Sequence, residues 1–368
     1  MSMPSVCDLA PANIRAIAPY QPGKPISELE RELGISDIVK LASNENPLGA
    51  SPAVARAVNE AMAEVARYPD GNGFALKQAL AQFHALPQEF VVLGNGSNDV
   101  LELVAKAFLA PHTSAVFSQY AFAVYPLATQ AMAARAVVVP ARNFGHDLRA
   151  MAASVAGDTR VVWIANPNNP TGTLAQPSEI EDFLVELPDR VIVVLDEAYG
   201  EYLEAAVRVD SLALLRRFPN LIITRTFSKA YGLAGLRVGY ALAQPAVADL
   251  LNRVRQPFNV SSVAQVAAVA ALGDQSFVAR SADLNRAGMA QLCGGFAQLG
   301  LTYIPSAGNF VTVQVGAGER VFQSLLRRGV IVRPLVGYGM PEHLRVTVGS
   351  ETENRRFLEA LRPVLSGS

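Results

Sequence analysis

Lys229 lies among residues that suit a buried, nucleophilic amine. It belongs to the run 226–237 (TFSKAYGLAGLR), between two apolar segments that we expect to be strands. Burial lowers the pKa of a lysine, and the free amine that results can form a Schiff base. The hydroxyls of Thr226 and Ser228 and the guanidinium of Arg237 suit phosphate oxygens. An aldehyde that carries a phosphate fits both halves, so the run predicts pyridoxal phosphate. An exposed loop lysine is the alternative, because most lysines are exposed.

Asp196 directly follows the apolar run 191–195, and Tyr199 lies three residues further on. A carboxylate at the end of a buried strand is costly unless it is paired. A protonated pyridine nitrogen is such a partner, with an attraction of about 4 kcal/mol at an effective dielectric near 20. The pairing would keep the ring an electron sink. The alternative is an aspartate that caps a helix.

Two further turns follow predicted strands. The turn 166–172 (NPNNPTG) holds two prolines and a glycine, and Asn169 within it could direct its amide to the cofactor's phenolic oxygen. The turn 94–99 (GNGSND) places glycines before a helix, where backbone N–H groups bind phosphate. It lacks the dinucleotide-binding spacing and the Walker lysine. Plain structural turns would explain both compositions.

Aromatic and basic side chains supply the remaining candidates. We expect Tyr120 to open a helix after the strand 115–117, where its ring could stack on a pyridine or pack in the core. Arg345 alternates with apolar residues on a predicted strand, and its guanidinium suits a carboxylate or a phosphate. Arg333 is a similar candidate. An exposed strand face is the alternative for both arginines.

The composition indicates small-molecule chemistry. The chain has 368 residues, 51% of them hydrophobic, and a net charge of −1, so nothing favours nucleic acid or an anionic membrane as a partner. Cys7 and Cys293 are too few for a disulfide framework or a zinc site. We find no signal peptide and no membrane span. These features predict a cytoplasmic protein.

The pattern predicts an α/β fold with a mostly parallel sheet. Short, continuously apolar runs alternate with helical spacing from about residue 90, which is typical of strands covered on both faces; the runs are 90–93, 115–117, 136–139, 161–165, 191–195, 221–224 and 238–242. The candidate residues therefore fall at strand ends, where such sheets bind ligands. We expect a large cofactor-binding domain over residues 45–260. Residues 1–44 and 261–368 would form a smaller α+β domain with an N-terminal arm.

Taken together, these motifs resemble the fold-type I pyridoxal-phosphate-dependent aminotransferases in order and approximate spacing. Within that superfamily the segments 43–47 (SNENP), 67–73 (RYPDGNG), 166–172 and 344–349 (LRVTVG) are similar to the histidinol-phosphate aminotransferase family. The resemblance covers nearly the whole chain. It implies transfer of an amino group from histidinol phosphate to 2-oxoglutarate, in histidine biosynthesis. The alternatives are an aromatic amino acid aminotransferase and a lyase similar to threonine-phosphate decarboxylases.

The resemblance also implies a role for each matched residue. Lys229 would bind the cofactor's aldehyde and move the substrate's proton, and Asp196 would pair with the pyridine nitrogen. Tyr199 and Asn169 would bond the phenolic oxygen, and Tyr120 would stack on the ring. The phosphate would be held by Ser97, Asn98, Thr226, Ser228, Arg237 and, from the neighbouring subunit of a homodimer, Tyr68. Arg345, assisted by Tyr20 and Arg333, would bind the substrates' anionic groups.

Overall fold

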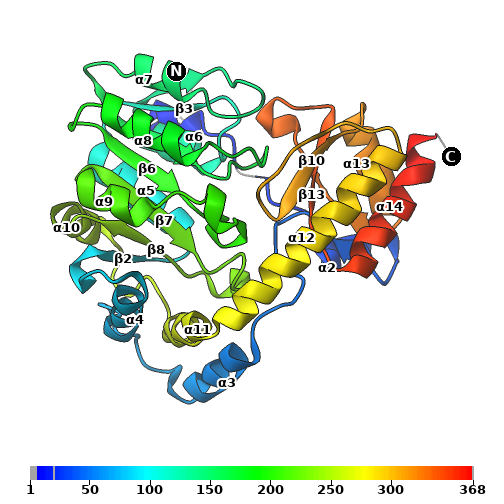
Figure 1. Ribbon diagram of the computed structural model, residues 1–368, viewed down its shortest axis with the longest axis horizontal. Coiled ribbons are helices and arrows are strands. Elements are labelled where there is room, and N and C mark those ends of the chain that lie inside the picture. Colours follow the sequence, from blue (N-terminus) through cyan, green and yellow to red (C-terminus); the bar gives the residue numbers. More distant parts are fainter. Residues whose placement is uncertain (1–5, 20, 367–368) are drawn as a thin grey trace.

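The computed structural model describes residues 6–19 and 21–366, which form a large and a small lobe. Figure 1 shows the large lobe as a sheet between layers of helices, and the long helix α12 (Gln275–Gln298) running from it into the small lobe. The predicted Tyr20 lies outside the described residues. The α/β class expected from the sequence is confirmed.

The large lobe is built on a seven-stranded sheet. Its strands in spatial order are β2 (Val91–Gly94), β8 (Gly239–Ala243), β7 (Leu221–Thr226), β6 (Ile192–Asp196), β5 (Thr159–Ala165), β3 (Ser114–Ser118) and β4 (Arg135–Val139). Each starts within two residues of its predicted position. The pairs from β7 through β6, β5 and β3 to β4 are parallel, whereas β8 is antiparallel to both of its neighbours.

The reversed direction of β8 follows from the connection that precedes it. Residues 227–238 contain no α-helix, only the 3-10 turn η6 (Ala234–Leu236). A parallel crossover needs a longer connection, usually a helix, so the chain returns beside β7 in the opposite direction. This connection carries Lys229, which therefore stays at the edge where β7 ends.

Both faces of the sheet are covered, which explains why its strands are apolar throughout. On β6, Val193 and Leu195 belong to one core cluster, and Ile192 and Val194 belong to the other. The second face is covered by α5 (Ser97–Phe108), α6 (Val124–Ala131) and α10 (Pro245–Val254). The first is covered by α3 (Pro52–Ala61), α4 (Phe74–His84), α7 (Leu148–Ala153), α8 (Pro177–Glu186), α9 (Ser211–Arg217) and α11 (Ser262–Gly273).

The small lobe is an antiparallel sheet with helices on it. The sheet's strands in order are β12 (Arg333–Pro334), β13 (His343–Thr347), β10 (Phe310–Gln314) and β9 (Tyr303–Ile304). Its core also contains residues of α12, α13 (Gly318–Arg327) and α14 (Glu351–Leu365). β1 (Val39–Lys40) pairs in parallel with β11 (Val330–Ile331), and α2 (Ile26–Leu33) packs nearby through Leu29. The beginning and the end of the chain therefore build this lobe together.

Packing moves the lobe boundary beyond the predicted residue 260. Helix α11 packs against α3 and α4, and Ala264, Ala267 and Ala268 belong to the large lobe's core. Val278 near the start of α12 joins the same core, whereas Leu292 and Phe296 near its end lie in the small lobe's core. The boundary between the lobes thus falls inside α12. The small alanine side chains of α11 let that helix pack closely against the large lobe.

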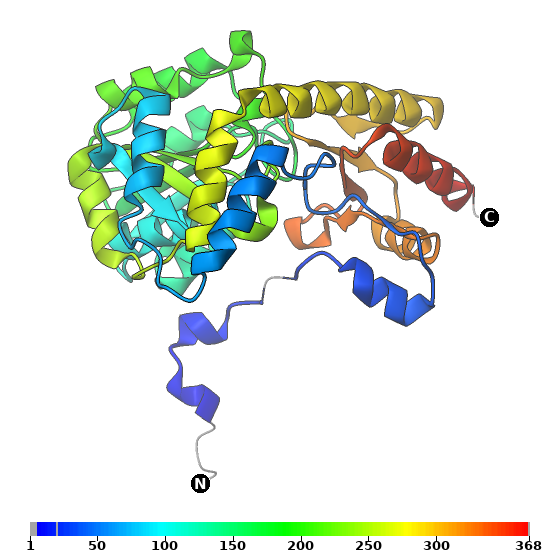
Figure 2. The same ribbon diagram turned by 90° about the horizontal axis from the view of Figure 1, so that it is seen from below.

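The N-terminal segment forms an arm (Figure 2). It consists of η1 (Val6–Leu9) and α1 (Ala12–Arg15), and Asn13 donates from Nδ2 to the carbonyl oxygens of Gln130 and Ala131 at 3.0 and 3.1 Å. Residues 21–44 of the predicted N-terminal part of the small domain therefore contact the small lobe, whereas the arm lies against the end of α6.

Five further 3-10 turns complete the described structure. These are η2 (Met62–Glu64), η3 (Gln88–Phe90), η4 (Gly200–Tyr202), η5 (Ala205–Val207) and η7 (Val336–Tyr338). Within residues 6–19 and 21–366 no single helix is long and apolar enough to cross a membrane. Helices α11 and α12 meet that length and composition only as a pair, bent by 79°.

Candidate active site

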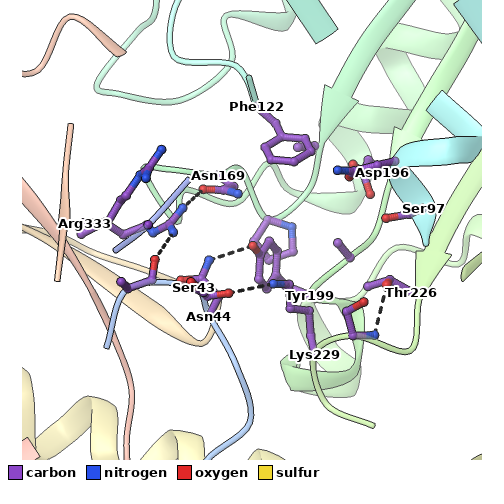
Figure 3. Close-up of a pocket in the computed structure, with 18 of the residues that line it drawn as sticks. Ser43, Asn44, Ser97, Phe122, Asn169, Asp196, Tyr199, Thr226, Lys229 and Arg333 are labelled. Atoms are coloured by element: carbon purple, nitrogen blue, oxygen red, sulfur yellow. Dashed lines mark hydrogen bonds between the residues drawn. The ribbon is translucent and has the colours of Figure 1, made fainter. Parts of the chain in front are cut away.

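An open cavity lies between the lobes, at the carboxyl ends of β5, β6 and β7. Figure 3 shows Lys229, Asp196, Tyr199 and Thr226 around it, together with Asn169 and Arg333. The predicted residues Ser97, Asn98, Ser228, Arg237 and Arg345 also line it. The fold therefore brings residues from most of the chain into one site.

Lys229 projects into this cavity from the connection between β7 and β8. Its Nζ donates to the carbonyl oxygen of Ser43 at 3.1 Å, and it lies 5.9 Å from the centre of the Tyr199 ring. Desolvation lowers the pKa of Lys229 to about 7, and the guanidinium of Arg345 adds to the effect. A large fraction of Lys229 is thus a neutral amine near neutral pH, as a Schiff-base lysine requires.

Asp196 ends β6 and is only 4% exposed. Its Oδ2 accepts a hydrogen bond from the Tyr125 hydroxyl at 2.9 Å, whereas its buried Oδ1 makes no hydrogen bond to any described residue. Burial raises the pKa of Asp196 to about 6. A buried carboxylate oxygen left without a partner is unusual, and a protonated ring nitrogen in the cavity would satisfy it.

Tyr125 itself is a residue that the sequence did not single out for this role. It is fully buried, and its ring stacks on Trp163 at 5.3 Å between ring centres. This packing fixes the hydroxyl against Asp196. Tyr120, Phe122 and Tyr125 lie close together in the sequence, but their positions alone do not say which ring reaches a carboxylate.

The turn 166–172 places Asn169 beside Arg345. Arg345 donates from Nη1 to Asn169 Oδ1 at 2.6 Å and from Nη2 to the carbonyl oxygen of Ala42 at 2.8 Å. Its guanidinium also lies 5.3 Å from the centre of the Phe310 ring. Because Asn169 accepts through its oxygen, its Nδ2 remains to donate to a ligand. Arg345 is 7% exposed and on a strand that faces the cavity, so the exposed-strand alternative is wrong.

A cradle for an anion forms where α5 begins. Gly96 has φ +78°, and a Cβ there would come within 2.5 Å of Arg237 Nη2. A Cβ on Gly239 would come within 2.5 Å of the backbone nitrogen of Ser97. Arg237 Nη1 lies 3.4 Å from Ser228 Oγ, and the Ser228 backbone N–H donates to Thr226 Oγ1 at 3.1 Å. The glycines keep this approach open, so a phosphate fits among the N–H groups, hydroxyls and guanidinium.

Tyr120 is placed differently from the prediction. It lies in the turn before α6, which begins only at Val124, and it does not line the cavity. Its ring stacks on Phe144 at 5.9 Å, and it packs with Ile304 and Leu335 of the small lobe. Phe122 lines the cavity instead (Figure 3). The turn residues 119–123 are not helical, so Phe122 lines the cavity where Tyr120 does not, and its ring is available to stack on a bound ring.

Two predicted residues lie at or beyond the edge of the site. Arg333 lines the cavity, and its Nη2 donates to the carbonyl oxygen of Gln21 at 2.6 Å. Tyr68 does not line the cavity; it is 84% exposed and stacks on Phe258 at 4.9 Å. Within one chain, therefore, Tyr68 is not part of the site.

A buried ion pair lies directly behind Asp196. The next residue, Glu197, accepts from Arg225 at 2.8 Å and from the Ser211 hydroxyl at 3.0 Å. The side chains of Arg225 and Glu197 are 17% and 7% exposed. This network joins the ends of β6 and β7, which carry Asp196 and Thr226.

We expect Arg225→Met to lower the free energy of unfolding by about 3 kcal/mol, because it leaves the Glu197 carboxylate buried without its partner. Denaturant unfolding of the cofactor-free protein measures this. The matched control is Arg217→Met, which breaks the exposed pair with Glu181 and should cost less than about 1 kcal/mol. Equal losses in the two variants would contradict the argument.

The comparisons with known proteins agree with this geometry. Residues 36–361 match the model of the family "Aminotransferase class I and II". The chain belongs to this family. It is an aminotransferase of the fold-type I class, and its cofactor is pyridoxal 5'-phosphate.

Two relatives with high sequence identity carry a more specific name than the family. The chain is 60% identical over 367 residues to "Histidinol-phosphate aminotransferase 1" of Thiobacillus denitrificans, covering 99% of this chain and 96% of that protein. It is 59% identical over 365 residues to the histidinol-phosphate aminotransferase of Methylobacillus flagellatus, covering 99% of both.

Solved structures share the fold. The histidinol-phosphate aminotransferase of Sinorhizobium meliloti, in complex with pyridoxal-5'-phosphate, has a TM-score of 0.90 at 27% identity, covering 98% of each chain. The aspartate aminotransferase of Thermus thermophilus with maleate has a TM-score of 0.83 at 22% identity, covering 96% of this chain and 99% of that one, which shows the fold alone.

Proposed function

We propose that this protein transfers an amino group between histidinol phosphate and 2-oxoglutarate, giving imidazole-acetol phosphate and glutamate, as a step of histidine biosynthesis. The observation that carries the proposal is the pairing, across one cavity, of Lys229 and Asp196 with the guanidiniums of Arg345 and Arg333. The names of relatives about 60% identical over almost their whole length support the same substrate.

The chain's own residues have separate tasks in this reaction. The cofactor supplies an aldehyde for the amino group and a ring that accepts electrons from the substrate's Cα. Lys229, with its lowered pKa, would take the proton from the substrate's Cα and deliver it to the C4′ carbon, and Asp196 would hold the proton on the ring nitrogen. The cradle around Ser97, Thr226 and Arg237 holds the cofactor's phosphate. Arg345 and Arg333 bind the substrates' carboxylate and phosphate groups, because a guanidinium fits either anion.

Initial rates of the purified holoenzyme with three amino donors test the substrate. Histidinol phosphate should be turned over with 2-oxoglutarate much faster than phenylalanine, because its phosphate presents a charge near −2 to Arg345 and Arg333, whereas phenylalanine presents only the single charge of its carboxylate. Threonine phosphate should release no carbon dioxide. Faster turnover of phenylalanine would show an aromatic aminotransferase, and carbon dioxide from threonine phosphate would show a decarboxylase.

We also propose that the protein is a homodimer in which Tyr68 of each subunit reaches the other subunit's phosphate cradle. In support, Tyr68 is 84% exposed, and it stands among other exposed apolar side chains of the same region: Met62, Val65, Phe74 and Phe258. A patch of this kind is typical of a protein interface. A phenol is a suitable hydrogen-bond donor to a phosphate.

Co-expression of two impaired variants tests the dimer. Tyr68→Ala should lower kcat/KM at limiting cofactor by about tenfold to hundredfold, since it removes one hydrogen bond to a charged group. When it is co-expressed with Lys229→Ala, half of the randomly formed dimers should contain one site with both residues, which restores about a quarter of the wild-type activity. Activity no greater than that of the separate variants would show that Tyr68 does not act across subunits.

We propose the cytoplasm as the place of action. In support, Cys7 and Cys293 are both free thiols in the structure. Cell fractionation with activity measured in each fraction tests this, and activity confined to the periplasmic or membrane fraction would contradict it.

A further inference from the structure

Asn44 has a conformation and burial that the fold alone does not require. It is 1% exposed and lies in the segment that crosses from β1 of the small lobe toward the large lobe. Its φ is +54°, in the left-handed region, which asparagine tolerates better than most residues other than glycine. Figure 3 shows its side chain directed at Tyr199.

The hydrogen bonds of Thr347 fix which way the Asn44 amide points. Thr347 Oγ1 accepts from the backbone N–H of Asn44 at 2.9 Å, so its own proton is available to another acceptor. The side-chain oxygen of Asn44, Oδ1, lies 3.1 Å away and is that acceptor. If the Asn44 amide were turned by 180°, its Nδ2 hydrogens would face the Thr347 hydroxyl proton, and no hydrogen bond could form there. The Nδ2 of Asn44 is therefore the atom that faces Tyr199.

The Asn44 amide in turn restricts the Tyr199 hydroxyl. Asn44 Nδ2 donates to the Tyr199 hydroxyl oxygen at 2.9 Å. An N–H₂ group cannot accept a proton, so the O–H bond of Tyr199 must point elsewhere. Burial raises the pKa of Tyr199 to about 12, which keeps that proton in place. Tyr199 lines the cavity, where a bound cofactor offers an acceptor.

The small lobe holds Asn44 in place for this contact. Thr347 is the last residue of β13, and Asn309, just before β10, donates from Nδ2 to the Asn44 carbonyl oxygen at 3.0 Å. Both partners are buried. A hydroxyl of the large lobe is thus oriented through an amide that the small lobe fixes.

We propose that Asn44 is a positioning residue that directs the Tyr199 proton to the phenolic oxygen of the bound cofactor. It touches Tyr199 and acts through it. This role concerns the bound cofactor alone, so its test does not depend on which amine is the substrate.

The test is a pH titration of the visible absorbance of the holoenzyme, compared with that of Asn44→Gly. Glycine keeps the positive φ without strain and removes only the amide. The hydrogen bond from Tyr199 stabilises negative charge on the cofactor's phenolic oxygen. Without this bond the bound cofactor should keep its proton to higher pH, so the titration midpoint should rise by about one pH unit, as expected for one hydrogen bond to a charged group. Affinity for the cofactor should fall in the same variant.

Two further variants separate this role from a merely structural one. In a Tyr199→Phe background, Asn44→Gly should shift the midpoint no further, because the hydroxyl that it orients is gone. Asn309→Ser loosens the same segment but keeps the Asn44 amide and its contact with Tyr199, so it should shift the midpoint much less than Asn44→Gly does. Thr347→Val, which frees the amide to turn, should shift the midpoint in the same direction and carries the test if Asn44→Gly does not fold.

Three outcomes would overturn the proposal. The first is an unchanged midpoint in the folded Asn44→Gly protein or, if that variant does not fold, in Thr347→Val. The second is that Asn44→Gly shifts the midpoint as far in the Tyr199→Phe background as in the wild type. The third is that Asn309→Ser shifts the midpoint as far as Asn44→Gly does.

Discussion

Lys229→Ala should lose the visible absorbance of the holoenzyme and about 10⁴-fold or more of kcat/KM, because both the covalent attachment and the proton transfer depend on this amine. The reason lies in its surroundings. Desolvation and the guanidinium of Arg345 lower the pKa of Lys229 to about 7, and Nζ already lies inside the cavity. Absorbance spectra and initial rates with saturating cofactor measure both losses.

The matched control for this variant is Lys106→Ala. Lys106 lies on α5, whose first residues form the phosphate cradle, but its side chain is 40% exposed and pairs with Glu102. Its replacement should change neither the spectrum nor the rate. A visible band that persists in Lys229→Ala would refute the assignment of the attachment site, and a full rate without the band would refute the role in proton transfer.

Asp196→Asn should lower kcat by about 10³-fold, which corresponds to the loss of an attraction of about 4 kcal/mol between a carboxylate and a protonated ring nitrogen. The amide keeps the volume of the side chain, so the cofactor should still bind. The fall should therefore appear mainly in kcat and less in cofactor affinity. Single-turnover rates with a saturating donor measure it. A variant that retains a tenth of the wild-type rate would show that the ring nitrogen needs no charged partner.

The same substitution should stabilise the protein without cofactor. Burial raises the pKa of Asp196 from 3.8 to about 6, so between these values the folded state binds a proton that the unfolded state does not. The contribution of this group to stability is thus present at low pH and is lost as pH rises through 6. At pH 8, Asp196→Asn should be more stable than the wild type by about 3 kcal/mol, and the difference should vanish near pH 4. Denaturant unfolding at the two pH values measures this.

The sequence predicted the residues at strand ends well, for a physical reason. Asp196 and Asn169 each follow a continuously apolar run, and the carboxyl ends of parallel strands meet at one edge of the sheet. Chain order and strand direction alone therefore bring these side chains together. Lys229 joins them because its connection starts at the same edge.

Residues whose roles depend on side-chain direction were not predictable in this way. Tyr120 and Phe122 are two residues apart in an irregular turn, and only the structure shows that Phe122 faces the cavity. Asn44 approaches Tyr199 from 155 positions away in the chain, and its left-handed φ has no sequence signature of its own. The direction of β8 and the packing of α11 likewise depend on tertiary contacts that periodicity does not contain.

In the pairs β1–β11 and Asn44–Thr347, a segment near the start of the sequence contacts one near its end. The active site can therefore be completed only late in synthesis. Domains begin to fold from the N-terminus as the ribosome extends the chain. The large lobe's sheet is complete once β8 has emerged, but Arg345 and Thr347 lie on β13, which is synthesised much later. A nascent chain therefore has a lysine-bearing edge without the residues that close the cavity over it. Cofactor retention should thus mark chains that extend past residue 347, and products that stop before residue 345 should not hold it.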